Sequence, residues 1–145
     1  MFSNSCKYAI RAVLYLATHT DEEKKVKVED IAEALDIPKH FLAKLLMQLT
    51  KHQIISSLKG RNGGFYLTKQ DRSKTLLNVI EAIDGLSKMR ECVLGLDNCS
   101  DERPCPYHFA VGEFKTKFYD QLRDETIQMC AERIDEWELK LINTP

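Results

Sequence analysis

The residues best suited to chemistry lie in one segment, Cys92-x6-Cys99-x5-Cys105-x2-His108. Three thiolates and an imidazole form a complete set of four ligands, and soft sulfur donors select iron-sulfur clusters, zinc or copper(I) over hard cations. The surrounding segment from Arg90 to Tyr107 contains a glycine and two prolines and lacks helical periodicity. We therefore expect an irregular loop, of a length usually kept only for function, that holds a metal centre.

The spacing of the ligands bears on the metal group. Structural zinc sites usually contain cysteine pairs separated by about two to four residues, whereas the thiols here are more widely spread. A wider loop suits a cluster, because its ligands must reach around a larger object. The spacing favours an iron-sulfur cluster, with zinc as the alternative.

The other two cysteines have a different context. Cys6 and Cys130 lie within helical patterns, so we interpret them as core residues. No signal sequence and no apolar run of about 18 residues is evident, so we expect a cytoplasmic protein without a membrane segment. The odd total of five cysteines also argues against a disulfide framework.

The charge is unevenly distributed along the chain. Residues 39–75 contain eight Lys or Arg against one acidic residue, Asp71, a local balance of +7 within a chain of net charge −1. A polyanion would be attracted to this region and repelled by the remainder, which would orient the protein on DNA. The alternative is a solvated basic face.

Apolar periodicity predicts the elements that carry this charge. A first helix is expected over 4–18, a short extended lead over 26–28, a second helix over 29–35 and a third from about Pro38 to Lys51. Proline is well tolerated in the first turn of a helix. A fourth helix covers 76–83, and Gly85 closes it.

A hairpin follows the third helix, with strands at 54–58 and 65–67 and a turn at 59–64 that is rich in Gly and Asn, which accept positive φ. The fold class is therefore mainly α with a small β-hairpin wing: a winged helix-turn-helix. In such a domain the third helix lies in the DNA major groove, and Arg61 of the hairpin could enter a minor groove. The predicted DNA-binding residues are Lys39, His40, Lys44, Gln48, Lys51, Lys59, Arg61 and Asn62.

The segment from Phe109 onward forms a long C-terminal helical region. Phe114, Phe118 and Leu122 are one turn apart, and the apolar stripe continues to Leu141. Since four helices already supply a core, a second copy of the chain is the economical partner for this stripe, giving a homodimer that reads paired half-sites. The alternative is that the stripe folds back onto its own core.

Motifs for enzymatic chemistry are missing from the sequence. It contains no phosphate-binding loop of the GxxxxGK type and no plausible spacing for a Ser, His, Asp triad. We expect a protein that is not an enzyme.

The chain resembles the Rrf2 family of winged-helix transcription regulators, and within it the iron-sulfur sensors of the IscR and NsrR type. The likeness covers about residues 5–127. It rests on the motifs Tyr8-Ala9-Ile10-Arg11-Ala12, Ile31-Ala32-Glu33, Phe41-Leu42, the wing 59–67, the segment 78–85 and the cysteine loop.

The resemblance implies a two-iron, two-sulfur cluster held by Cys92, Cys99, Cys105 and His108. Members of the NsrR type hold a four-iron cluster and use an acid from the first helix, where this chain has Lys7 and Tyr8, so the histidine is favoured and a four-iron cluster is the alternative. The resemblance also implies that iron-sulfur status, redox state or nitric oxide controls DNA binding.

We therefore expect three parts: a DNA-binding domain over 1–85, a cluster-binding loop over 86–108 and a dimerisation region over 109–145. The partners would be a second copy of the chain and a palindromic double-stranded DNA operator. The alternatives are a cluster-free regulator that senses a metabolite, a partner protein or thiol oxidation, and a zinc-stabilised interaction module.

Overall fold

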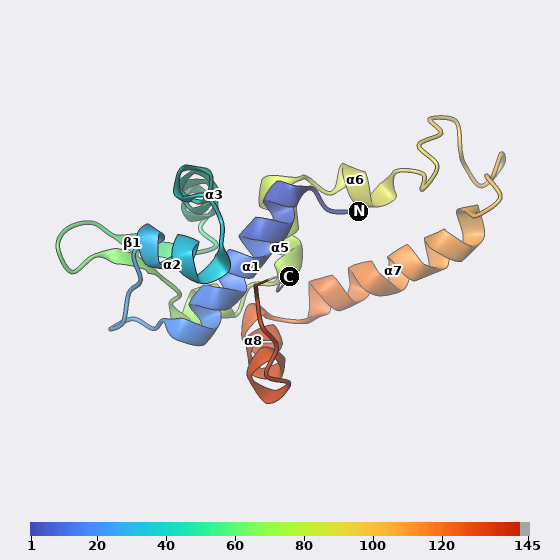
Figure 1. Cartoon of the computed structure of the whole chain (residues 1–145). Coiled ribbons are helices and arrows are strands. Elements are labelled where there is room, and N and C mark those ends of the chain that lie inside the picture. The colour runs from blue at the N-terminus through green and yellow to red at the C-terminus, as the bar shows by residue number, and fades with distance from the viewer. Residues whose placement is uncertain (143–145) are drawn as a thin grey trace.

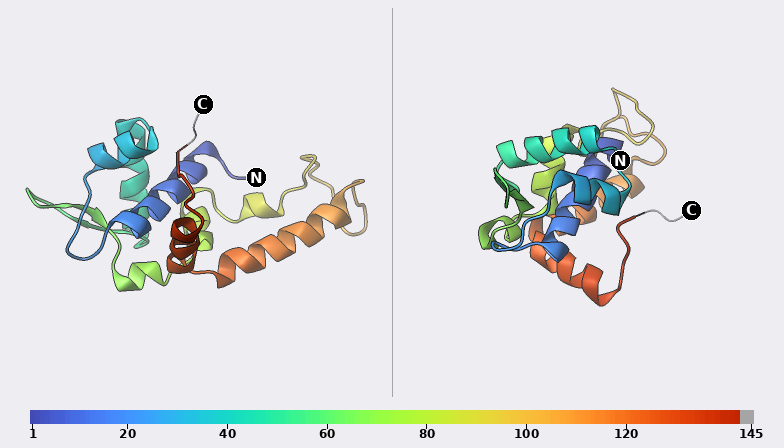
Figure 2. Two further views of the ribbon diagram at one scale, coloured as in Figure 1. Left: turned by 60° about the horizontal axis from the view of Figure 1, so that its bottom comes forward. Right: turned by 60° about the vertical axis from the view of Figure 1, so that its left-hand side comes forward.

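The computed structural model describes residues 1–142. Its described part contains eight helices and one two-stranded sheet. A compact body and a projecting arm share the chain, and the arm consists of two antiparallel segments joined by a loop at the tip (Figure 1). The left view of Figure 2 shows the same separation, and in its right view the arm lies behind the body.

The first three helices of the body are α1 (Asn4–His19), α2 (Val28–Leu35) and α3 (Lys39–Lys51). The Ser3 hydroxyl caps α1 by accepting the Cys6 backbone N–H. Asp36 ends α2 in the left-handed conformation, and Pro38 stands immediately before α3. The three helices lie within a few residues of their predicted positions.

The wing is an antiparallel hairpin of β1 (Ser56–Leu58) and β2 (Gly64–Tyr66), in which Ser57 pairs with Phe65. Val26 adds an isolated bridge to Phe65. The turn uses Gly60 and Gly64 for its positive φ angles, whereas Asn62 is not among the residues with positive φ. The predicted strands were too long at one end each, because Ile54, Ile55 and Leu67 turn inward and are buried in the core.

Two capping boxes build the elements that follow the wing. Thr68 and Asp71 cap the short helix α4 (Lys69–Arg72), and Thr75 and Asn78 cap α5 (Leu76–Ile83). The buried Asp71 carboxylate also accepts from the Ser56 hydroxyl at 2.7 Å, which fixes β1 to α4. The wing is therefore anchored to the body at its base.

The arm consists of α6 (Ser87–Arg90), the cysteine loop and α7 (His108–Asp124). The chain then returns to the body as α8 (Ile127–Glu136). The predicted C-terminal stripe is thus divided: Ile127 and Ala131 of α8 lie in the main core of their own chain, as the fold-back alternative expected. Residues 143–145 of the predicted dimerisation region lie outside the described residues.

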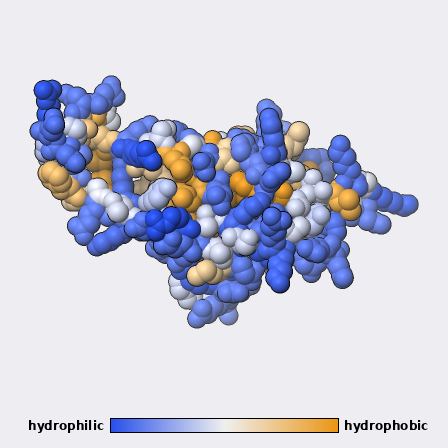
Figure 3. All heavy atoms as spheres, turned by 180° about the vertical axis from the view of Figure 1, so that it is seen from behind, coloured by the Kyte–Doolittle hydropathy of each residue, from blue (hydrophilic) through white to orange (hydrophobic). Residues whose placement is uncertain are grey.

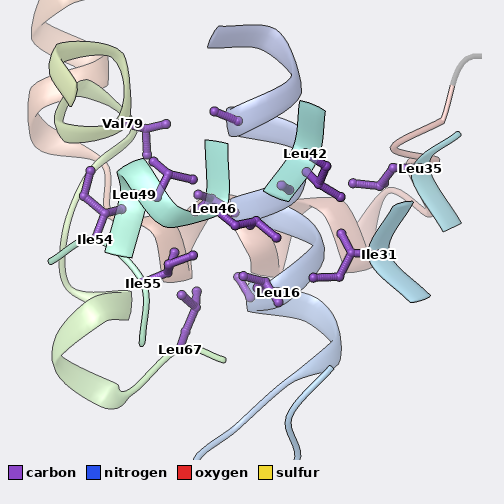
Figure 4. Packing of buried hydrophobic residues seen from close by; sticks show 14 of the residues in the cluster. Leu16, Ile31, Leu35, Leu42, Leu46, Leu49, Ile54, Ile55, Leu67 and Val79 are labelled. Carbon is purple, nitrogen blue, oxygen red and sulfur yellow. The ribbon is translucent and has the colours of Figure 1, made fainter. Parts of the chain in front are cut away.

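The main core fills the space between α1, α2, α3, the base of the wing, α5 and α8 (Figure 4). Leu42, Leu46 and Leu49 of α3 recur at helical spacing and are fully buried there. A smaller second cluster joins the arm to the body and contains Cys6, Leu77, Ile80, Met89 and Leu122. None of the helices within residues 1–142 combines the length and apolar composition that a bilayer crossing requires.

Candidate metal centre and nucleic-acid interface

The cysteine loop is a series of tight turns, and each predicted ligand begins or ends one of them. Backbone bonds run from Gly95 to Cys92, from Cys99 to Leu96 and from His108 to Cys105. Gly95 has φ +70, a conformation that residues with a Cβ rarely adopt. The turns fold the loop back on itself and bring its ligands together at the tip of the arm.

The three predicted thiols converge. The sulfur atoms of Cys92, Cys99 and Cys105 all lie within 4.8 Å of one another. The Sγ atoms of Cys92 and Cys105 are 3.7 Å apart. Two thiolates bound to one tetrahedral metal atom with bonds of about 2.3 Å would be about 3.8 Å apart. This pair therefore fits a shared metal atom, in a cluster or as zinc.

The predicted fourth ligand lies beside them. Nδ1 of His108 is 3.1 Å from the Cys99 sulfur, and its Nε2 is 2.8 Å from Oδ1 of Asp101. A carboxylate at Nε2 favours the tautomer with its proton there, which leaves the Nδ1 lone pair directed at the thiols. Asp101 was not identified from sequence, although an acid between cysteine ligands is a signal that could have found it.

Backbone amides change the acidity of one thiol. The amides of Leu96 and Leu94 lower the pKa of Cys92 to about 7, which favours the thiolate form that binds metals. For Cys99, the Cys105 amide acts in the same direction, but burial and the neighbouring thiols raise the pKa overall. Burial, followed by the nearby Asp84, raises the pKa of Cys6 to about 12. Cys6 is thus an inert core residue, as expected.

Space and charge around the thiols also suit an inorganic group. A cleft of about 90 Å³ opens between the loop and the first turns of α7. Since a water molecule occupies about 30 Å³ in the liquid, the cleft has room for a group of a few atoms. Lys115 and Arg90 line it, and the Lys115 ammonium donates to the Glu91 carbonyl. The acidic Glu91 also lines the cleft, so the two cations outnumber it by one and would offset part of the negative charge of the thiolates.

The predicted DNA-binding residues gather on α3 and the wing turn. His40, Lys44, Lys51, Lys59, Arg61 and Asn62 are exposed. Lys39 is also exposed and forms an ion pair of 2.7 Å with Glu29. Met47, also on α3, is 69% exposed.

Two polar residues of the basic segment 39–75 point into the protein instead. The Gln48 amide donates to the Ala82 carbonyl of α5 at 2.8 Å, and Gln48 is half-buried. The Arg72 guanidinium donates to the Ala17 carbonyl and the Gln128 side chain. Both side chains therefore connect elements of the body, and Arg72 is one of the positive charges counted from the sequence.

The predicted dimerisation residues lie in three different environments. Phe114 is 55% exposed, whereas Phe118 stacks on it and contacts Phe2. Leu122 is buried in the second core cluster of its own chain, which leaves little of it for a partner. Figure 3 shows apolar residues near the middle of one face and toward the tip of the arm, within a largely hydrophilic surface.

Comparison with known proteins gives a consistent result. A family model described as Rrf2, iron-dependent transcriptional regulator, matches residues 2–133. A protein of Aquifex aeolicus assigned to the HTH-type transcriptional regulators is 36% identical over 130 residues, covering 88% of this chain and 89% of that one. The HTH-type transcriptional regulator NsrR of Geobacillus kaustophilus is 33% identical over 112 residues, covering 77% and 76%.

Solved structures show the same fold. IscR of T. potens superposes with a TM-score of 0.71 at 20% identity, covering 96% of this chain and 91% of that one. CymR, the global cysteine regulator of B. subtilis, superposes with a TM-score of 0.71 at 18% identity, covering 92% and 97%. The winged-helix fold expected from the sequence is confirmed, and the chain belongs to the Rrf2 family of transcriptional regulators.

Proposed function

We propose that this regulator binds operator DNA with an affinity controlled by an iron-sulfur cluster, held by Cys92, Cys99, Cys105 and His108. The observation that carries the proposal is the convergence of three thiols within 4.8 Å at the tip of the arm. A two-iron cluster suits three thiolates and one imidazole, and a four-iron cluster is the alternative. When bound, the cluster would supply a redox-active group that oxidants, nitric oxide or iron shortage alter.

The DNA-binding part of the proposal rests on α3 and the wing. Lys44 and Lys51 project from the outer face of α3, and Arg61 lies at the exposed wing turn. This arrangement supports insertion of α3 in a major groove, with Arg61 beside it in a minor groove. Regulators of this type act on DNA in the cytoplasm, where we place this one.

The route from the arm to α3 passes through α5. His108 begins α7, and Leu122 near the other end of that helix packs with Leu77 and Ile80 of α5. The Gln48 amide then joins α3 to the last turn of α5. A cluster that binds one arrangement of the arm more tightly than another would change the affinity for DNA by a coupling factor, typically ~5 to 150-fold. Bound DNA would change the affinity for the cluster by the same factor.

We further propose that two copies associate through the exposed face of α7 and read a palindromic operator. Phe114, on the face that carries Phe118, is 55% exposed. A twofold dimer places two α3 helices on paired half-sites. The arm would thus join the metal centre to the interface that sets the spacing of the two reading helices.

Anaerobic purification of the full chain tests the cluster. We expect coloured protein with iron and sulfide in equal amounts, about two of each per chain for a two-iron cluster. Cys105→Ala should abolish the colour, and Cys130→Ala is the matched control that should keep it. Colourless protein with one zinc per chain would contradict the proposal and favour the zinc-stabilised alternative.

The DNA affinity of the coloured and colourless forms tests control by the cluster. We expect the two forms to differ by a factor within the coupling range given above, measured by fluorescence anisotropy at fixed salt. Equal affinities would remove the sensory role. A cluster-free regulator that senses a metabolite, a partner protein or thiol oxidation is the second candidate, because CymR, described as the global cysteine regulator of B. subtilis, has the same fold.

A further inference from the structure

Two of the three loop thiols are in direct contact. The sulfur atoms of Cys92 and Cys105 are 3.7 Å apart, and a disulfide bond measures about 2.05 Å. The two sulfur atoms would have to approach by about 1.7 Å to form the bond. The turn that follows Cys92 is exposed and contains Gly95, so the backbone there has freedom to adjust.

The third thiol is held differently. The Cys99 sulfur accepts the Cys105 backbone N–H at 3.4 Å and faces Nδ1 of His108 at 3.1 Å. These polar partners hold Cys99 beside the histidine. The Cys99 sulfur also lies within 4.8 Å of the other two. Because Cys99 has these polar partners and the sulfurs of Cys92 and Cys105 are 3.7 Å apart, Cys92 and Cys105 are the pair we expect to react with each other.

The two members of this pair differ in access. Cys105 is 8% exposed, whereas Cys92 is half-buried and borders a second opening between α6 and the loop. Of this pair, Cys92 is therefore the member that an oxidant from solution meets first, and Cys105 is in position to complete the reaction.

We propose that Cys92 and Cys105 form an intrachain disulfide when the loop holds no metal group. With a small disulfide such as oxidised glutathione, the Cys92 thiolate attacks one sulfur, forms a mixed disulfide and releases one glutathione thiolate. The Cys105 thiolate then attacks the Cys92 sulfur and releases the second. Two electrons pass to the oxidant, and the two protons of the cysteine thiols pass to the two released glutathiones.

The bond would have two consequences. It removes two of the four ligands, so the loop cannot take up a metal group until it is reduced. It also joins the end of α6 to the start of α7, because Cys92 follows Arg90 by two residues and Cys105 precedes His108 by three. The loop would therefore stay closed without a metal.

Peptide mapping of the full-length chain tests the pairing. Protein stripped of metal and reductant is treated with oxidised glutathione, and its free thiols are then alkylated. A protease that cuts before aspartate cleaves at Asp97 and Asp101, which places Cys92, Cys99 and Cys105 on three separate peptides. We expect one cross-linked pair, Cys92 with Cys105, and alkylated Cys99. A cross-link that includes Cys99, or glutathione adducts alone, would overturn the proposal.

Two variants sharpen the result. Cys92→Ala should give no intrachain link between loop cysteines, whereas Cys99→Ala should form the Cys92–Cys105 link as wild type does. If Cys99→Ala loses the link, Cys99 takes part in the exchange and the pairing is wrong. A parallel sample carries both Cys6→Ala and Cys130→Ala, which leaves only the three loop cysteines. Oxidation of this double variant should still lower its intact mass by about 2 Da.

Cobalt(II) provides a measurement that is independent of the proposed cluster. The reduced loop should give thiolate-to-cobalt absorption, the oxidised loop should give none, and a phosphine reductant should restore it. Unchanged absorption after oxidation would contradict the loss of ligands. Failure to assemble an iron-sulfur cluster would sink the proposed function and leave this disulfide intact, so the two failures are distinguishable.

Discussion

The body and the arm of this molecule are stabilised in different ways. In the body, α1, α3, α5 and α8 share a continuous apolar core, and local side-chain bonds fix the helix ends. In the arm, the loop from Val93 to Pro104 has no buried residue, and α7 buries only Leu122. The body therefore holds its shape through its own packing, whereas the arm depends on what binds its thiols and on what covers its exposed face.

The largest expected difference between the two regions is in stability. Leu46→Ala should lower the free energy of unfolding by about 2–5 kcal/mol, because Leu46 is fully buried between helices of the body. Leu96→Ala in the arm is the matched control, and it should change that free energy by less than about 0.5 kcal/mol. Urea denaturation of the metal-free chain measures both, and equal losses would contradict the division.

The dimer provides the next comparison. Phe118 contacts Phe2 of its own chain, so a charge at position 118 would disturb both the body and a partner. Phe114 is exposed and separates the two effects. Phe114→Glu should weaken association by about 2–4 kcal/mol with little change in unfolding by urea. Sedimentation at micromolar concentration measures it, and a wild-type chain that sediments as a monomer would refute the interface.

The difference in packing between the body and the arm also explains how well the sequence predicts each of them. The leucines on the apolar stripe of α3 are the ones that are buried, because a helix with a single apolar face packs that face against the core. The stripe that includes Leu122 was assigned to a partner, but periodicity identifies an apolar face without naming what covers it. The four-residue helices α4 and α6 were missed because they are too short to show periodicity.

The sequence predicted some contacts of the candidate sites and missed others. Residue type and spacing were sufficient to select Cys92, Cys99 and Cys105, and the structure brings them together. The contact of Asp101 with His108 depends on the path of the loop between them, which has no periodic pattern. Gln48 lies on the polar face of α3, yet the sequence did not show that α5 packs against that position.

Direct contact with DNA should involve the body and not the arm. Arg61→Ala should weaken binding to a specific site by ~1–3 kcal/mol and reduce the salt dependence, whose log-log slope is near −0.9 per phosphate neutralised. Arg103→Ala is the matched control, since Arg103 is an exposed arginine of the cysteine loop. Equal losses for the two variants, measured by anisotropy titrations at several salt concentrations, would argue against the wing assignment.

The smallest expected effect concerns the hydrogen bond that joins α3 to α5. Gln48→Ala should lower the free energy of unfolding by about 0.5–1.5 kcal/mol, because the Ala82 carbonyl loses its side-chain donor in a half-buried position. Lys44→Ala, on the exposed side of the same helix, should leave unfolding unchanged and reduce the salt slope of DNA binding by about 0.9. Paired urea and anisotropy measurements on the two variants separate a residue that supports α3 from one that contacts DNA.

If Gln48→Ala keeps its stability and instead loses ~1–3 kcal/mol of affinity for the operator, Gln48 reads a base. The α3–α5 bond would then open in the complex, and the route from the arm to α3 would pass through packing alone.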